Sequence, residues 1–387
     1  MKYKLIIGTF YIPLIALAVV SQLYILMPVS TNLLLFVTHA SADNIGLLTT
    51  FFGIFYAIGL IVWGSLSDKI GKDLTLIIGL LLLACVSFIL PLLANYYLLL
   101  LARSAQGFCA ASFPPVALAW ISINLPDSSK SKAISIISCA FLLAATIGQW
   151  LGSLLISNSL LYAMWFLGGI YASGATIFYV YHLKSEKNNL AVPSTTLITI
   201  LSKLPTILIN KKLFPVYLCS LFVLLGFVAL YSVLYRSSLI SHITTLRSIG
   251  IVAMLFSLTA SYLFKVIKPA YVLAIALCVM ALTLLIQAFF INDQINTLII
   301  LYLSHFIFII GLAYAIPSMI VYVATQSEIK DRGIATSLYT CILFIGVSLG
   351  AFLPSLINPF VLITALSLLL LLCAIQLIIN LTLIIRN

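Results

Sequence analysis

Charged residues are scarce in this 387-residue chain, of which Asp, Glu, Lys and Arg together make up only 7%. Soluble domains are about 25% charged and about 45–50% apolar. Here 64% of the residues are hydrophobic and the mean hydropathy is +1.26. A soluble domain of this size has no core large enough to hide so much apolar surface. The composition therefore excludes a soluble fold and indicates an integral membrane protein whose surroundings are the lipid bilayer.

Several functional classes lack the residues that they need. The seven cysteines are widely separated and follow no disulfide or metal-ligand spacing, so we expect neither a metal nor a cofactor. A membrane-embedded acyl or glycosyl transferase needs clustered His, Asp or Glu at the membrane surface, and a channel needs a filter-like repeat or a charged ring. Neither pattern is present, so we expect no enzyme. The net charge of +11 is spread over short loops, which disfavours a nucleic-acid partner.

Apolar runs long enough to span a bilayer recur along the whole chain, separated by polar breaks. They predict an all-α protein with twelve transmembrane helices, near 5–30, 44–65, 74–94, 97–122, 133–156, 160–182, 213–236, 245–264, 270–290, 297–324, 333–356 and 360–384. The longest break, 183–212, is rich in lysine and predicts a cytoplasmic central loop. This loop divides an N-terminal six-helix bundle (1–182) from a C-terminal one (213–387).

The basic residues predict the orientation of these helices. With a cytoplasmic N-terminus, all but three of the 19 Lys and Arg residues fall on the cytoplasmic side. The exceptions are Arg103, inside a span, and Arg236 and Arg247, which flank one outer loop. The positive-inside rule therefore predicts that both termini are cytoplasmic. The two halves also repeat a pattern, because Lys130-Ser-Lys132 and Lys330-Asp-Arg332 open corresponding spans. Parallel six-helix repeats are typical of rocker-type secondary transporters.

Two motifs carry a resemblance to the major facilitator superfamily. Residues 64–73 read GSLSDKIGKD and resemble that superfamily's Gly-x-Leu-x-Asp-x-x-Gly-Arg-Lys signature between helices 2 and 3. Asp73 departs from the pattern, because a basic residue is common there. In span 4, Arg103, Gln106 and Gly107 match an Arg-x-x-Gln-Gly motif. The sequence that follows is similar to the bacterial drug-efflux branch of small-molecule exporters, so the resemblance implies the two-bundle fold of this superfamily.

A third feature lies in span 5, where Ala144, Gly148 and Gly152 recur every four residues. We expect these small residues to allow close helix packing. The exporters usually carry Gly-Pro before the last glycine, whereas Gln149 stands at the proline position here. This difference weakens the match to an antiporter.

The first motif implies a conformational latch. We expect Asp68, with Lys69 and Lys72, to join the two halves and stabilise the outward-facing state, while Gly64 and Gly71 allow the tight turn. The alternative interpretation is a solvated turn that obeys the positive-inside rule.

Arg103 is the strongest single candidate for substrate binding or coupling. It lies about 9 Å into its span at 1.5 Å per residue, where an isolated charge is costly. We expect it to face a water-filled cavity, with Gln22 and Gln106 as partners. The alternative is an arginine that snorkels outward as an anchor. Since helices 1, 4, 7 and 10 line the cavity in the resembling family, the resemblance adds Tyr24, Tyr231, Arg236, His305 and Tyr314.

The predicted function is secondary transport. No acidic residue lies deep in a span, and Gln22 stands where proton-driven members of the resembling family carry a carboxylate. His305 is the best substitute proton carrier, because imidazole titrates near neutrality. The alternative interpretation is a neutral histidine that is hydrogen-bonded within the helix bundle. We expect a monomeric exporter of a small organic solute in the bacterial inner membrane, with protons as a candidate coupling ion. The alternative is an importer or facilitator of an anionic nutrient or a metal chelate such as a siderophore.

Overall fold

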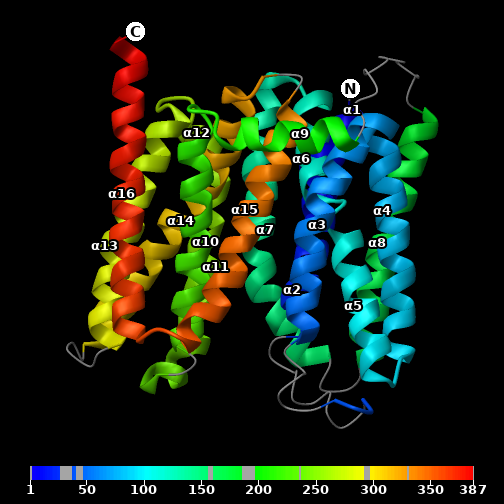
Figure 1. Cartoon of the computed structure of the whole chain (residues 1–387), viewed down its shortest axis with the longest axis horizontal. Coiled ribbons are helices and arrows are strands. Elements are labelled where there is room, and N and C mark those ends of the chain that lie inside the picture. The colour runs from blue at the N-terminus through cyan, green and yellow to red at the C-terminus, as the bar shows by residue number, and fades with distance from the viewer. Residues whose placement is uncertain are drawn as a thin grey trace. The chain divides into compact units, whose positions relative to one another are not determined.

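The computed structural model describes residues 2–26, 37–40, 47–155, 160–184, 197–234, 237–291, 297–328 and 331–386. Within these ranges the chain is helical almost throughout, and its only β-type pairing is an isolated bridge between Thr38 and Asn95 (Figure 1). Twelve helices in the described part are long and apolar enough to cross a membrane. The all-α, twelve-span prediction is therefore confirmed, and the chain is a multi-pass membrane protein.

The first six spans follow the predicted order. They are α1 (Lys2–Ile6), η1 (Ile7–Tyr11) and α2 (Ile12–Tyr24) for span 1; α3 (Leu47–Ile70); α4 (Lys72–Ile89) with η3 (Leu90–Leu92); α5 (Tyr96–Ala110) with α6 (Pro114–Asn124); α7 (Asp127–Leu155); and α8 (Leu160–Lys184). A short helix, α9 (Leu197–Leu208), lies in the predicted central loop and has too few residues to span a bilayer.

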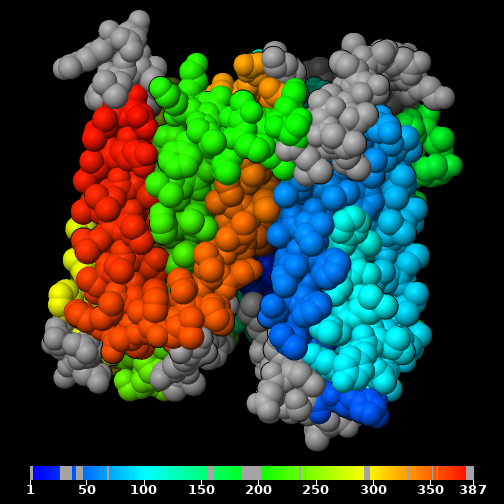
Figure 2. All heavy atoms as spheres, viewed as in Figure 1, coloured from blue at the N-terminus to red at the C-terminus, as the bar shows by residue number. Residues whose placement is uncertain are grey.

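The last six spans begin with α10 (Phe214–Leu234). The others are α11 (Ile243–Met254), η5 (Leu255–Thr259) and α12 (Ala260–Leu263) for span 8, preceded by η4 (Ser238–His242); α13 (Pro269–Ile291); α14 (Leu298–Gln326); α15 (Arg332–Phe352) with η6 (Leu353–Ser355); and α16 (Pro359–Arg386). The side chains that α16 leaves exposed include Leu368, Leu372, Ile375 and Ile379. This helix, red in Figure 2, thus has the apolar outer face that lipid contact requires.

Prolines explain two irregular spans. In span 1 the π-helical turn η1 ends at Tyr11, two residues before Pro13, which lacks an N–H and crowds the preceding turn. In span 4 the helix stops at Ala110 and restarts at Pro114. Between them, Ser112 and Phe113 bond only three residues back, at 3.1 and 3.2 Å. The break follows from Pro114 and Pro115, because neither has an N–H to donate to the carbonyls of Ala110 and Ala111 four residues back.

The structure corrects the predicted length of the loop between spans 2 and 3. The sequence predicts a polar turn over residues 66–73, whereas α3 continues to Ile70 and α4 begins at Lys72. Gly71 alone joins them, with φ at +93°, a left-handed value that favours glycine. Span 5 also begins earlier than predicted, at Asp127, so that Lys130 and Lys132 lie in the first turns of α7. Polar residues can continue a helix beyond the bilayer, which hydropathy alone does not reveal.

The chain divides into two compact units. The first comprises residues 1–133, 140–205 and 336–338, and the second comprises 134–139, 206–335 and 339–387. In the first unit α4 packs on α5 and α8, and α3 packs on α5. In the second unit α13 packs on α14 and α16, and α11 packs on α14. Numbered by span, these are the same pairings, so the repeat seen in the sequence is also a repeat of helix packing.

Candidate functional site

Among the described residues of the first unit, Arg103 is the largest charged side chain that is buried. Its helix α5 places it eighth in a 29-residue span, where its side chain is fully buried. The guanidinium Nη1 donates to Gln106 Oε1 at 2.6 Å, and Nη2 donates to the backbone oxygen of Gln22 at 3.4 Å. Its carbon lies 4.3 Å from the centre of the Phe52 ring. The structure thus places Gln22 and Gln106 beside Arg103, as the sequence predicts.

A network of neutral groups continues from these partners. The Tyr171 hydroxyl donates to Gln22 Oε1 at 3.0 Å, and Gln106 Nε2 donates to Ser87 Oγ at 2.8 Å. Gln22 Nε2 also lies 3.2 Å from the Met164 sulfur. We call this set the Arg103 cluster: Gln22, Phe52, Ser87, Arg103, Gln106, Met164 and Tyr171. Tyr24 is buried two residues beyond Gln22 on α2.

The charge of the Arg103 cluster is not balanced within it. None of the contacts described for Arg103 is to a carboxylate, and its Nε is buried without a hydrogen-bond partner in the described part of the chain. Buried charges are ordinarily paired, because removing an ion from water is costly. Such a site is suited to receive an anionic group. No group of three or more His, Cys, Asp or Glu side chains that could hold a metal ion occurs among the described residues.

His305 is the corresponding residue of the second unit. It is fully buried on α14 and, like Arg103, is the eighth residue of a 29-residue span. Its Nε2 lies 2.9 Å from the Tyr231 hydroxyl, and its Nδ1 lies 3.1 Å from Gln287 Oε1. Since Gln287 Oε1 only accepts, Nδ1 carries the proton in a neutral ring and Nε2 accepts from Tyr231. We call Tyr231, Gln287 and His305 the His305 cluster.

Other predicted cavity residues lie apart from these clusters or outside the description. The Tyr314 hydroxyl is 2.7 Å from that of Thr259, a residue of η5. Arg236 lies outside the described residues. In span 5, the Ala144 carbonyl accepts from Ser21 Oγ at 3.3 Å. A Cβ on Gly148 would come within 2.6 Å of the Ser21 carbonyl, so α7 approaches α2 closely here. Gly152, one turn further, is buried.

The residues of the predicted latch lie around the α3–α4 joint. Gly64 is buried, and its carbonyl accepts from Ser67 Oγ at 2.7 Å. Lys69 is exposed, while Lys72 Nζ donates to Ser67 Oγ at 3.2 Å across Gly71. The side chain of Asp68 lies outside the described residues. The latch between halves stays a prediction.

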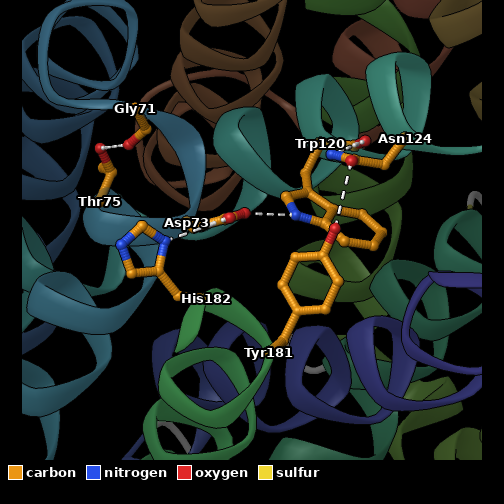
Figure 3. Close-up of polar contacts among 7 residues, drawn as sticks. All are labelled: Gly71, Asp73, Thr75, Trp120, Asn124, Tyr181 and His182. Carbon is orange, nitrogen blue, oxygen red and sulfur yellow. Dashed lines mark hydrogen bonds and ion pairs between the residues drawn. The ribbon is translucent and has the colours of Figure 1, made fainter. Parts of the chain in front are cut away.

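Asp73 is the centre of a further polar group in the first unit, at the α6 end of span 4 (Figure 3). Its Oδ1 accepts from Trp120 Nε1 at 2.7 Å, and its Oδ2 lies 3.5 Å from His182 Nδ1. The Tyr181 hydroxyl donates to Asn124 Oδ1 at 3.4 Å. Trp120, from α6, is fully buried and meets the Tyr181 ring edge to face at 5.6 Å. Helices α4, α6 and α8 therefore meet at this group.

Sequence reasoning missed several members of these clusters. Gln287 had a usable signal, because a glutamine within an apolar span is a candidate functional residue by default. Tyr171 and Ser87 had none, since hydroxyl side chains are common in membrane helices and only the fold shows which ones face Gln22 or Gln106. Trp120 and His182 are separated from Asp73 by 47 and 109 residues, so no local pattern joins them.

Comparison with known proteins places the chain in a family. The family model described as Major Facilitator Superfamily matches residues 13–351. Among curated proteins, the chain is 25% identical over 211 residues to the uncharacterized transporter BU588 of Buchnera aphidicola and 27% identical over 151 residues to the inner membrane transport protein YajR of Escherichia coli. These matches cover 53% and 39% of this chain but only 50% and 33% of the two relatives.

Solved structures share the fold over nearly the whole chain. The human organic anion transporter MFSD10 (TETRAN) superposes with a TM-score of 0.75 at 16% identity, covering 97% of this chain and 99% of that one. The fucose:proton symporter FucP of E. coli gives 0.70 at 18% identity, with 97% and 98% covered. Identities this low show the fold alone, but the family model spans most of the chain. The resemblance carried by the two motifs is thus confirmed, and the chain belongs to the major facilitator superfamily of transporters.

Proposed function

We propose that this transporter exports a small organic solute across the bacterial inner membrane by alternating access between its two six-helix bundles. The observation that carries the proposal is the pair of matched clusters. Each unit buries one basic side chain, Arg103 or His305, at the same position of its fourth span. Polar groups buried in spans are costly and usually functional. Each cluster is therefore the candidate solute-binding site of its own unit.

The proposal keeps the orientation and assembly predicted from the sequence. Both termini and the 183–212 loop lie in the cytoplasm, residues 1–182 and 213–387 form the two bundles, and the protein works as a monomer. In this arrangement Asp68, Lys69 and Lys72 act as the cytoplasmic latch. Protons are the candidate coupling ion, with His305 as their carrier because its ring already bonds Tyr231 and Gln287.

One observation favours the second candidate, an importer or facilitator of an anionic nutrient or a metal chelate. Arg103 makes only neutral contacts in the described part of the chain, and its Nε has no partner there. An anionic solute would supply the missing charge. A cationic drug would instead be repelled, so the identity of the substrate decides between an efflux pump of the drug type and this alternative.

Transport into proteoliposomes tests both candidates. The purified chain is reconstituted, and uptake of aromatic carboxylates, their neutral amides and cationic amines is measured with and without a pH gradient. Arg103→Gln removes the charge, and Arg103→Lys is the matched control that keeps it. For an anionic substrate we expect Arg103→Gln to reduce uptake at least tenfold, because losing one partner of a buried charged contact costs about 2–5 kcal/mol.

The outcomes separate the candidates. Uptake that follows the proton gradient and is lost in His305→Ala supports proton-coupled transport. Gradient-independent uptake of carboxylates that requires Arg103 supports the facilitator. No transport of any probe, or equal transport by wild type and both variants, would contradict the assignment of these clusters.

A further inference from the structure

We propose that a pH-dependent contact between Asp73 and His182 holds α4, α6 and α8 together at one end of the first unit. We call this contact, with the Trp120 hydrogen bond to Asp73, the fastening. Asp73 stands in the first turn of α4, where a carboxylate is favoured by the helix dipole. Its two oxygens face different helices: Oδ1 accepts from Trp120 of α6, and Oδ2 faces His182 of α8 (Figure 3). One carboxylate therefore connects three helices.

The α6 side of the fastening is rigid. The Trp120 side chain is fully buried, and its Nε1–H points to Asp73 Oδ1 at 2.7 Å. Its ring also meets Phe178 and Tyr181 of α8 edge to face, at centroid distances of 6.2 and 5.6 Å. A large indole held in this way has little freedom, so it fixes Oδ1 in place.

The α8 side is loose and can respond to protons. His182 Nδ1 lies 3.5 Å from Asp73 Oδ2, whereas a charge-assisted bond between such groups is about 2.7–2.9 Å long. The histidine and aspartate side chains are 33% and 23% exposed, so protons from water can reach them. Imidazole is the side chain that gains a proton in the physiological pH range. A protonated ring turns a weak contact into an ion pair and draws α8 toward α4.

The charged and titratable groups around the ring support this arrangement. From α4 come Asp73 and Lys72, and the Lys72 ammonium bonds Ser67. On α8, Lys184 lies over the Tyr3 ring of α1 at 5.9 Å, and the Tyr181 hydroxyl bonds Asn124 of α6. Helix α6 itself contributes only neutral groups here, Trp120 and Asn124. Two other elements pack on α8: α2 contributes one titratable group, Tyr24 at its last residue, and η3 contributes none. Asp73 is thus the acidic partner of His182.

The position also explains the departure of Asp73 from the family signature. A basic residue there would place a cation against the Trp120 N–H and His182, and neither group could accept a hydrogen bond from it when the histidine is protonated. The chain therefore uses this position for a connection within the first unit. That the fastening lies on the cytoplasmic side rests on the proposed function. The contacts that join α4, α6 and α8 do not depend on that function. In that orientation the fastening responds to the pH of the cytoplasm.

Thermal unfolding of the full chain in detergent tests the proposal without any transport substrate. Melting temperatures are measured from pH 8 to pH 6 for wild type, His182→Gln and Asp73→Asn. The ion pair exists only with a protonated ring, so acidification should add a stabilisation that both variants lack. We expect the wild type to gain roughly 1–3 °C relative to either variant on acidification. The double variant should behave as each single variant does.

Two further measurements keep the result interpretable. Lys130→Gln removes the exposed 2.8 Å pair with Asp127, which contains no histidine, and should leave the wild-type pH response intact. Tryptophan fluorescence should show a pH-dependent component that is absent from both Trp120→Phe and His182→Gln. This readout serves even where Asp73→Asn fails to fold. The same pH response in wild type and His182→Gln would overturn the proposal, and it would do so whether or not the chain exports any solute.

Discussion

Replacing Arg103 with methionine distinguishes a functional arginine from a structural anchor. Methionine has a similar length but no charge. If the cluster exists to bind an anion, its guanidinium contributes little to the stability of the empty protein. If Arg103 is an anchor, the fold depends on it. The two interpretations therefore predict different melting temperatures for the same variant.

The contacts allow the expected change to be worked out. The short bond to Gln106 contributes about 1.5–3 kcal/mol as a charged hydrogen bond, and the 3.4 Å contact with Gln22 contributes less. The Phe52 ring at 4.3 Å contributes about 2 kcal/mol in a desolvated site. Against these stands the several kcal/mol needed to take an ion out of water. The terms nearly cancel, so Arg103→Met should change the free energy of unfolding by no more than about 2 kcal/mol.

The assay is thermal unfolding of the detergent-purified protein, paired with uptake by the same preparation. We expect the melting temperature of Arg103→Met to stay within a few degrees of the wild type while anion uptake is lost. Arg103→Lys should retain part of the uptake. A variant that no longer folds, or one that unfolds more than about 10 °C lower, would refute this reasoning and establish Arg103 as an anchor.

Two further predictions concern the helix contacts. Tyr231→Phe removes the hydroxyl bonded to His305 Nε2 while keeping the ring. We expect the free energy of unfolding to fall by about 1 kcal/mol and the pH dependence of transport to change. An unchanged pH profile would mean that this hydrogen bond has no role in proton coupling. Gly148→Leu should lower the yield of monodisperse protein sharply, because even a Cβ would approach the Ser21 carbonyl to 2.6 Å, whereas a normal yield would mean that α7 is free to move away.

The sequence was sufficient for the number and order of the spans because hydropathy records contact with lipid directly. It also led to Arg103, Gln22 and Gln106, since a charged group in an apolar run demands partners and the spacing of three residues supplies one of them. The ends of the helices were less accessible. Ile70 and Asp127 extend helices into polar stretches, and whether a polar residue is helical there depends on local turns such as Gly71 rather than on hydropathy.

The long-range partners were not predictable from spacing. Gln287 and His305 lie on successive spans, but only their packing brings Oε1 to Nδ1. Likewise, Asp73 differs from the family motif in a way that has no meaning until Trp120 and His182 are seen beside it. Which polar side chains meet across two helices depends on the rotation of each helix about its own axis. When a helix is apolar on all sides, the sequence does not show which face points inward, so this rotation cannot be predicted.

The interruption of span 4 has a mechanical consequence. Arg103 lies on α5 and Trp120 on α6, and the three residues between these helices form tight turns in place of a continuous helical ladder. An unbroken helix of this length behaves as a stiff rod and would carry any twist at Arg103 directly to Trp120. Because Pro114 and Pro115 have no N–H to continue the ladder, the span can bend and twist most easily at Ala111–Phe113. In the proposed function, the Arg103 end of the span reorients around the solute while Trp120 keeps its hydrogen bond to Asp73.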